Sequence, residues 1–331
     1  MKVVDMHCDT IGELLADHLK GGTMSILENP LHIDLKKMKK GDYLLQNFGL
    51  FVHLEKVKDP FAYAMKMVDT FYTELEAYPD QIGIVKTWED LEKNMAEGRM
   101  SAMLTLEEGG MCLGETALLR NFYRLGARMM TLTWNFQNQL GYPNRMELHE
   151  GESYPCFLPD TEHGLTEKGI EFVQEMERLG MIIDISHLND AGIWDVFRYT
   201  KKPFVASHSN ARALASHPRN LTDEMIRSLG ERGGVAGINF CASFLRDRDE
   251  EGKEPDHSYC RDMVAHMKHM KNTGGIGCLG TDFDGIGSIV EMKDCSGMQM
   301  LAEEMEKQGF TGSEIEAVFY KNVLRLYKEI L

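Results

Sequence analysis

Residues 181–208 read MIIDISHLNDAGIWDVFRYTKKPFVASH, a stretch with two short apolar runs on either side of a helical segment. The runs 181–187 and 203–208 have the length and the apolar, β-branched character of buried strands. Residues 188–199 between them have the length and apolar spacing of an amphipathic helix. This order predicts two parallel strands whose connection is covered by the helix.

The same alternation continues along the whole chain. Eight apolar runs are expected to form strands: Val3–His7, Leu44–Val52, Ala102–Glu107, Met129–Trp134, Met181–His187, Pro203–His208, Val235–Phe240 and Ile276–Asp282. Six intervening segments are expected to form helices: Phe61–Tyr78, Trp88–Glu97, Thr166–Leu179, Leu188–Tyr199, Asp223–Arg232 and Tyr259–Lys271. Eight such units close a barrel, so we expect one (β/α)8 TIM-barrel domain over residues 1–331. An open doubly wound sheet is the alternative, but the GxGxxG fingerprint that would favour it is absent.

Composition narrows the class of protein. The formal net charge of −16 argues against nucleic acid as a partner, because nucleic-acid binding needs a basic surface. No apolar run approaches the roughly 18 residues of a membrane-spanning helix, and the N-terminal MKVVDMHCDT lacks a signal-peptide pattern. The seven cysteines are odd in number and form no CxxC pair, which favours free thiols and a cytoplasmic location.

Ionisable residues stand where the predicted strands end. They are His7 and Asp9 on the first strand, Glu107 on the third, His187 on the fifth, His208 on the sixth and Asp282 on the eighth. The carboxyl ends of TIM-barrel strands meet at one mouth, which is where active sites lie. So many buried ionisable groups require a counter-charge, and bound metal would supply it. Imidazole and carboxylate ligands suit zinc, as they suit several other first-row metals.

Spacing suggests roles for the carboxylates. His7 and Asp9 are two residues apart, so on a strand both point to one side. The Glu107 carboxylate could bridge two ions, one through each oxygen. Glu108 could take this role instead, but we prefer Glu107 because it continues the strand alternation from Leu104. Asp282 fits a general acid or base, with a turn-capping role as the alternative.

Two further features concern the substrate. Arg219 could hold a substrate carboxylate, although a surface ion pair is an equal alternative on residue type alone. The irregular stretch from Asn135 to Glu162 is long enough to reach over the mouth of the barrel.

An ordered set of motifs resembles the membrane (renal) dipeptidase family. The matching pieces are DMHCDT at 5–10, LEEGG at 106–110, LGARMMTLT at 125–133, DISH at 184–187, SHSNAR at 207–212, HPRN at 217–220, GINF at 237–240 and GTDFDG at 280–285. The resemblance implies two zinc ions per chain, one held by His7, Asp9 and the bridging Glu107, and the other by Glu107, His187 and His208. It also implies that Asp282 is the catalytic acid/base and that Arg219 binds the terminal carboxylate of the substrate. Members cleave dipeptides, tolerate a D-residue on the C-terminal side and are often homodimers.

The sequence departs from the family at one position near the substrate. Many members carry a histidine after the fourth strand that contacts the substrate carbonyl, and ungapped spacing from Glu107 puts Trp134 there. We expect Trp134 to border the site and bind substrate, with Asn135 or Asn138 supplying a missing polar contact.

These inferences predict a binuclear zinc dipeptidase that acts through a metal-bridged hydroxide. The first alternative is another metal-dependent barrel hydrolase, acting on a cyclic amide, lactone or phosphoester. Many of those carry HxH on the first strand and a carboxylated lysine on the fourth, whereas this chain has HxD and no such lysine. The second alternative is a metal-binding barrel without activity.

Overall fold

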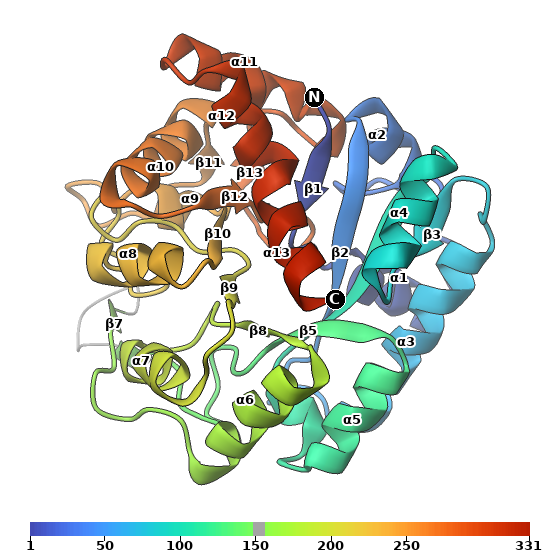
Figure 1. Cartoon of the computed structure of the whole chain (residues 1–331), viewed down its shortest axis with the longest axis horizontal. Helices are drawn as coiled ribbons and strands as arrows, with labels where there is room; N and C mark the ends of the chain where they lie inside the picture. Colours follow the sequence, from blue (N-terminus) through green and yellow to red (C-terminus); the bar gives the residue numbers. More distant parts are fainter. Residues whose placement is uncertain (148–155) are drawn as a thin grey trace.

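The computed structural model describes residues 1–147 and 156–331 and contains a closed barrel of eight parallel strands (Figure 1). Around the barrel the order is β2-β1-β12-β10-β9-β8-β5-β4, and β4 pairs back with β2 through the register Leu45–Phe51 to Ser101–Glu107. The strands are β1 (Val3–Asp5), β2 (Tyr43–Phe51), β4 (Met100–Glu107), β5 (Ala127–Thr131), β8 (Ile182–Asp184), β9 (Val205–Ala206), β10 (Val235–Ile238) and β12 (Gly277–Leu279). The predicted TIM barrel is therefore confirmed.

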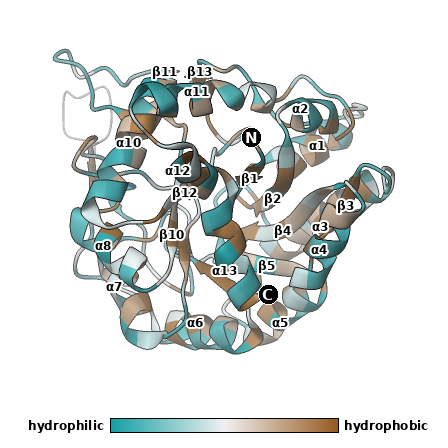
Figure 2. Cartoon of the chain, turned by 45° about the horizontal axis from the view of Figure 1, so that its top comes forward, coloured by the Kyte–Doolittle hydropathy of each residue, from teal (hydrophilic) through white to brown (hydrophobic). Residues whose placement is uncertain are grey.

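Helices surround the strands. The main ones are α3 (Pro60–Glu76), α4 (Trp88–Ala96), α5 (Thr116–Arg124), α6 (Glu167–Leu179), α7 (Asp190–Tyr199), α8 (Asp223–Glu231) and α10 (Cys260–Thr273). Figure 2 shows hydrophobic residues along strands such as β4 and β10, and hydrophilic residues on helices such as α6 and α8. This is the pattern expected when amphipathic helices cover a buried parallel sheet. All six predicted helices are confirmed, with ends that shift by a few residues.

The chain adds smaller elements to this frame. They are α1 (Thr10–Leu19), α2 (Leu35–Lys40), β3 (Ile82–Ile84), the 3₁₀ turns η1 (Gly109–Cys112) and η2 (Cys295–Gly297), α9 (Ala242–Leu245), β11 (His257–Ser258), β13 (Ile289–Val290), α11 (Gln299–Lys307), α12 (Gly312–Glu316) and the π-helical turn η3 (Ala317–Lys321). The short strand β3 was not predicted; it pairs with the first residues of β4, outside the closed ring. The loop predicted to be irregular also contains an antiparallel pair, β6 (Arg145–Glu147) and β7 (Cys156–Leu158).

One end of the barrel is closed by the last helix, α13 (Asn322–Ile330), which crosses the strands in Figure 1. A buried layer holds one residue from each of the eight strands, packed with three residues of this helix: Val4, Leu45, Met103, Met129, Ile182, Val205, Val235 and Cys278, with Val323, Leu326 and Tyr327. The hydroxyl of Tyr327 accepts a hydrogen bond of 2.6 Å from Asn47 Nδ2. Because α13 covers this end, the opposite mouth, at the carboxyl ends of the strands, is left for the site.

Two further expectations concern membranes and thiols. Among the described residues, none of the helices combines the length and apolarity needed to cross a membrane. The six cysteines whose side chains are described are free: Cys8, Cys112, Cys241, Cys260, Cys278 and Cys295.

Candidate metal and substrate site

The six ionisable residues singled out at strand ends converge at the mouth of the barrel. Glu107 is the last residue of β4, whereas the others lie two to four residues beyond the ends of β1, β8, β9 and β12. His7 and Asp9 were expected on a strand, but β1 ends at Asp5. They still flank Cys8, which forms an isolated parallel bridge with Phe283, so the backbone there remains locally extended.

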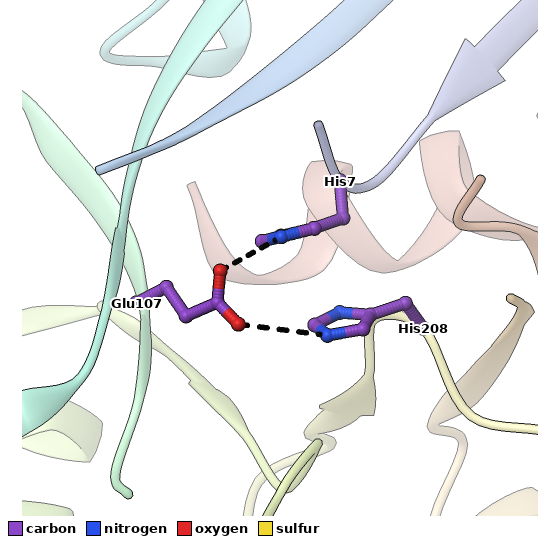
Figure 3. Close-up of side chains that lie close together, drawn as sticks. All are labelled: His7, Glu107 and His208. Atoms are coloured by element: carbon purple, nitrogen blue, oxygen red, sulfur yellow. Dashed lines mark ion pairs between the residues drawn. The ribbon is translucent and has the colours of Figure 1, made fainter. Parts of the chain in front are cut away.

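Glu107 lies at the centre of the cluster, between two sets of side chains. Its Oε2 is 2.9 Å from His7 Nε2, and its Oε1 is 3.1 Å from His187 Nε2 and 3.8 Å from His208 Nε2 (Figure 3 shows His7 and His208). The carboxylate therefore presents one oxygen to each set. Glu107 is only 3% exposed, so both oxygens are shielded from bulk water.

The same nitrogen of His7 also lies near two further carboxylates. Its Nε2 is 3.6 Å from Asp9 Oδ2 and 3.9 Å from Asp282 Oδ1. Ligand atoms of His7, Asp9 and Asp282 lie within 4.8 Å of one another, and so do those of His7, Glu107 and His208. The two groups share His7, and the second also joins His7 and His208, which contact different oxygens of Glu107.

Hydrogen bonds fix which nitrogen of each histidine faces the cluster. His187 Nδ1 is 3.1 Å from Asn135 Oδ1, which can only accept a hydrogen bond. Ser207 Oγ donates its proton to Asp184 Oδ2, so it can only accept from His208 Nδ1, at 2.6 Å. In the neutral histidines both Nε2 atoms then carry lone pairs rather than protons.

These two lone pairs point at one another. The Nε2 atoms of His187 and His208 are 3.0 Å apart and lie beside Glu107 Oε1. Burial lowers the pKa of both histidines well below its usual value, so both are neutral. Bare nitrogens and a carboxylate oxygen that face one another repel unless a cation lies between them. The donor set therefore fits a metal ion.

The charges on the other side of Glu107 fit a cation as well. Burial alone would lower the pKa of His7, but the carboxylates of Glu107 and Asp9 raise it well above its usual value. Burial raises the pKa of Glu107 to about 7 against the opposing effect of His7. Asp9 Oδ1 is buried without a hydrogen-bond partner among the described residues. An ion here would replace the proton on His7 and satisfy that oxygen.

Glu108 does not face the cluster. Its side chain accepts hydrogen bonds from the backbone N–H groups of Gly110 (2.7 Å) and Trp134 (2.8 Å), and from Asn138 Nδ2. Contrary to our expectation, Glu107 does not share a face of β4 with Leu104, because the two residues are an odd number of positions apart. Residues at even spacing share a face of a strand, so Glu107 lies on the face of Met103, which points into the barrel, while Leu104 packs toward the helices.

Backbone strain coincides with the cluster. His187 has φ = 67° and Asp282 has φ = 60°, in the left-handed region that residues other than glycine rarely adopt. Such a conformation costs on the order of 1–3 kcal/mol and is found most often at functional sites. Burial raises the pKa of Asp282 to about 7, and its Oδ2 accepts a hydrogen bond of 2.8 Å from Asn239 Nδ2. Its Oδ1 is left facing His7.

Arg219 is buried beside His208, not on the surface as the ion-pair alternative required. It is 6% exposed, and it donates hydrogen bonds to Ser209 Oγ (2.8 Å) and to the backbone oxygen of His208 (3.0 Å). Its Nε is buried without a partner among the described residues. Arg219 lines a cavity of about 540 Å³ and has donors left for a ligand there.

Trp134 lines the same cavity, as the sequence predicted for a residue bordering the site. Its ring centroid is 5.8 Å from that of His187. Of the two asparagines expected nearby, Asn135 orients His187, while Asn138 bonds Glu108 and the backbone oxygen of Leu132. Described parts of the predicted mouth loop, including Phe136 and Phe157, also line the cavity; residues 148–155 of that loop lie outside the described residues.

Sequence reasoning missed several residues of the site. His53 lines the cavity two residues after β2, and Asp184 and Asn239 support His208 and Asp282. His53 follows an apolar run as His7 does, and that position is the signal that could have identified it. The hydrogen bonds of Asp184 and Asn239 join neighbouring strands of the barrel that are far apart in the sequence, so no local sequence pattern predicts them.

Comparison with known proteins decides the family. The sequence matches the family model described as membrane dipeptidase, peptidase family M19, over residues 1–331. The chain belongs to the membrane dipeptidase family. This M19 member is thus a metal-dependent dipeptidase, a hydrolase of peptide bonds.

Relatives of the M19 member agree with this assignment. It is 31% identical to an uncharacterized dipeptidase of Schizosaccharomyces pombe, over 99% of this chain and 80% of the relative. The solved structure of a metallo peptidase from Rhodobacter sphaeroides, liganded with a phosphinate mimic of the dipeptide L-Ala-D-Ala, has a TM-score of 0.86 and 25% identity, covering 100% of this chain and 99% of that one. The structure of the M19 dipeptidase AC has a TM-score of 0.86 and 26% identity, over 100% and 98% of the two chains.

Proposed function

We propose that this chain hydrolyses dipeptides, including those with a C-terminal D-residue, at a site that holds two zinc ions. The observation that carries the proposal is the position of Glu107, whose two oxygens face two separate sets of ligand atoms. A carboxylate in that position can bridge two ions, one through each oxygen. The similarity to the Rhodobacter sphaeroides enzyme, solved with a mimic of L-Ala-D-Ala, supports the D-residue.

Each ion has a proposed set of protein ligands. His7, Asp9 and Glu107 would hold one, and Glu107, His187 and His208 would hold the other. Imidazole and carboxylate groups in three-residue sets leave positions open for water and substrate, as in catalytic zinc sites. Bound there, two zinc ions would polarise the scissile carbonyl and lower the pKa of a shared water to about 7.

Asp282 is the proposed acid/base. Asn239 holds its Oδ2, which leaves Oδ1 facing His7, 3.9 Å from Nε2. Asp282 would take the proton from the attacking water and pass it to the leaving amine. Proton transfer by such a positioned group contributes about 10²- to 10⁴-fold to a rate.

Arg219 and Trp134 are the proposed substrate-binding residues. Each terminal nitrogen of Arg219 uses one hydrogen within the protein and has one left, which can bind the carboxylate of the C-terminal residue. That carboxylate would then lie beside His208, whose backbone oxygen Arg219 already contacts. The requirement for a free carboxylate near the scissile bond favours dipeptides over longer peptides.

We further propose that residues 1–331 act as one catalytic domain in a cytoplasmic homodimer. The free thiols of the described cysteines are consistent with a reducing compartment. Sedimentation of the purified protein tests the dimer, and a monomer at all concentrations would refute it.

A metal-reconstitution assay tests the function. Protein stripped by chelation would be titrated with zinc and assayed on L,L-, L,D- and D,D-dipeptides. We expect activity to rise to a maximum at about two equivalents and to include the L,D substrates. Full activity in metal-free protein, or saturation at one equivalent, would contradict the two-ion site.

A further inference from the structure

The cavity beside the metal ligands has one wall made largely of aromatic rings. Trp134 packs against Phe136 with ring centroids 5.0 Å apart, and His53 contacts both, at 5.6 and 4.7 Å. All three residues line the 540 Å³ cavity. We call these three residues the aromatic wall. They come from two chain segments, the one after β2 and the one after β5.

His53 brings an unsatisfied polar atom to this wall. Its Nδ1 is buried and has no hydrogen-bond partner among the described residues. Leaving such an atom unpaired is unfavourable, and because it has almost no accessible surface, a ligand in the cavity would contact the ring of His53 and not Nδ1 itself. Trp134 and Phe136 are only partly buried, so their apolar faces are available to a ligand as well.

The position of Arg219 determines which part of a dipeptide meets the wall. Arg219 lies in the segment after β9. In the closed ring, Trp134 and Phe136 follow β5, two strands away, and His53 follows β2, four strands away on the opposite side. His187 follows β8, which lies between β9 and β5, and Glu107 ends β4, which lies between β5 and β2. A dipeptide with its carboxylate at Arg219 and its scissile carbonyl at Glu107 therefore directs its N-terminal residue toward the aromatic wall.

We propose that the aromatic wall is the pocket for the N-terminal side chain and that it selects bulky apolar or aromatic residues, with His53 as a specificity residue. This inference rests on the proposed dipeptidase function. Burial of a large apolar side chain against aromatic rings favours it over methyl or hydrogen by at least about tenfold in kcat/KM. The cavity has the volume for such a side chain in addition to the dipeptide backbone.

The test compares Phe-Ala, Leu-Ala, Ala-Ala and Gly-Ala, each in the stereochemistry that the zinc-loaded enzyme accepts. The expected result for wild type is a kcat/KM at least about tenfold higher for Phe-Ala and Leu-Ala than for Ala-Ala. Phe136→Ala, His53→Ala and Trp134→Ala should each reduce this ratio while metal content remains at the wild-type value. Phe244→Ala is the matched control, because Phe244 lines the same cavity beside Arg219 and should leave the N-terminal preference unchanged.

The outcomes separate the two proposals. Cleavage of all four dipeptides with equal kcat/KM would overturn the aromatic-wall inference and leave the dipeptidase function intact. If the zinc-loaded protein cleaves neither these four dipeptides nor any other dipeptide, both the proposed function and the aromatic-wall inference are overturned. An unchanged ratio in Phe136→Ala, His53→Ala and Trp134→Ala would likewise assign the preference to another part of the cavity.

Discussion

Asp184→Asn should weaken metal binding although Asp184 is not a proposed ligand. Its Oδ1 accepts hydrogen bonds from the backbone N–H groups of Ser186 (2.9 Å) and Ser207 (2.8 Å). Its Oδ2 accepts from the hydroxyls of Thr131 (2.8 Å) and Ser207. The bond from Ser207 turns that hydroxyl into an acceptor for His208 Nδ1, which keeps Nε2 free of a proton.

An amide at position 184 reverses this order of donors. If its oxygen keeps the two backbone N–H groups, its nitrogen must donate to Ser207 Oγ, and the Ser207 proton then points at His208 Nδ1. That arrangement favours the His208 tautomer with the proton on Nε2, which cannot bind a metal ion. Substitutions that disturb a ligand's outer partner typically reduce metal affinity or activity by about 10- to 100-fold. This corresponds to about 1.4–2.7 kcal/mol in binding free energy.

The assay is zinc binding to chelator-stripped protein, measured by competition with a chromogenic chelator. We expect one of the two ions, the one at His208, to bind about 10- to 100-fold more weakly in Asp184→Asn. Asp34→Asn is the control, because Asp34 is equally buried and accepts hydrogen bonds at the start of α2 from Lys37 and Asn29. Equal zinc affinity in Asp184→Asn and wild type, in folded protein, would refute the relay through Ser207.

His187→Ala should abolish activity and remove mainly one ion, since Glu107 still binds the other ion. Metal analysis checks this prediction, with His269→Ala as the control because His269 pairs with Asp223 at the start of α8. Retention of both ions in His187→Ala would contradict it. Asp282→Asn should keep both ions but lower kcat by at least about 100-fold. A kcat within tenfold of wild type would show that Asp282 has a structural role and is not the acid/base. Burial, with help from Arg219, lowers the pKa of His217 to about 3, so this histidine stays neutral in the fold and takes up a proton on unfolding below pH about 6.5. Its contribution to stability is therefore present above that pH and lost on acidification. Between pH 7.5 and 5.5 wild type should lose up to about 1.4 kcal/mol more unfolding free energy than His217→Gln, measured by urea titration, and identical losses would rule the effect out.

The fold was predictable because the signals that specify it are local. All eight barrel strands and six helices follow from apolar runs and helical spacing, which depend on neighbouring residues. The short β3 was missed because Ile82–Ile84 is three residues long and only one of its residues is buried, so it leaves little pattern. The antiparallel pair β6 and β7 was missed because polar residues and prolines obscure it.

The site was predictable as far as strand ends determine position. His7, Glu107, His187, His208 and Asp282 follow apolar runs, and the barrel topology brings such positions to one mouth. The tautomers of His187 and His208 could not be predicted, because they depend on Asn135 and on the Ser207–Asp184 pair. The face of β4 that carries Glu107 could not be predicted either, because packing against the barrel interior determines that face.

Anomalous diffraction at the zinc edge, from crystals of zinc-reconstituted protein, tests the central claim most directly. The account predicts two anomalous peaks per chain, one beside Oε2 of Glu107 near His7 and Asp9, and one beside Oε1 near His187 and His208. A single peak, or peaks that leave Glu107 without contact to an ion in protein that cleaves dipeptides, would contradict it.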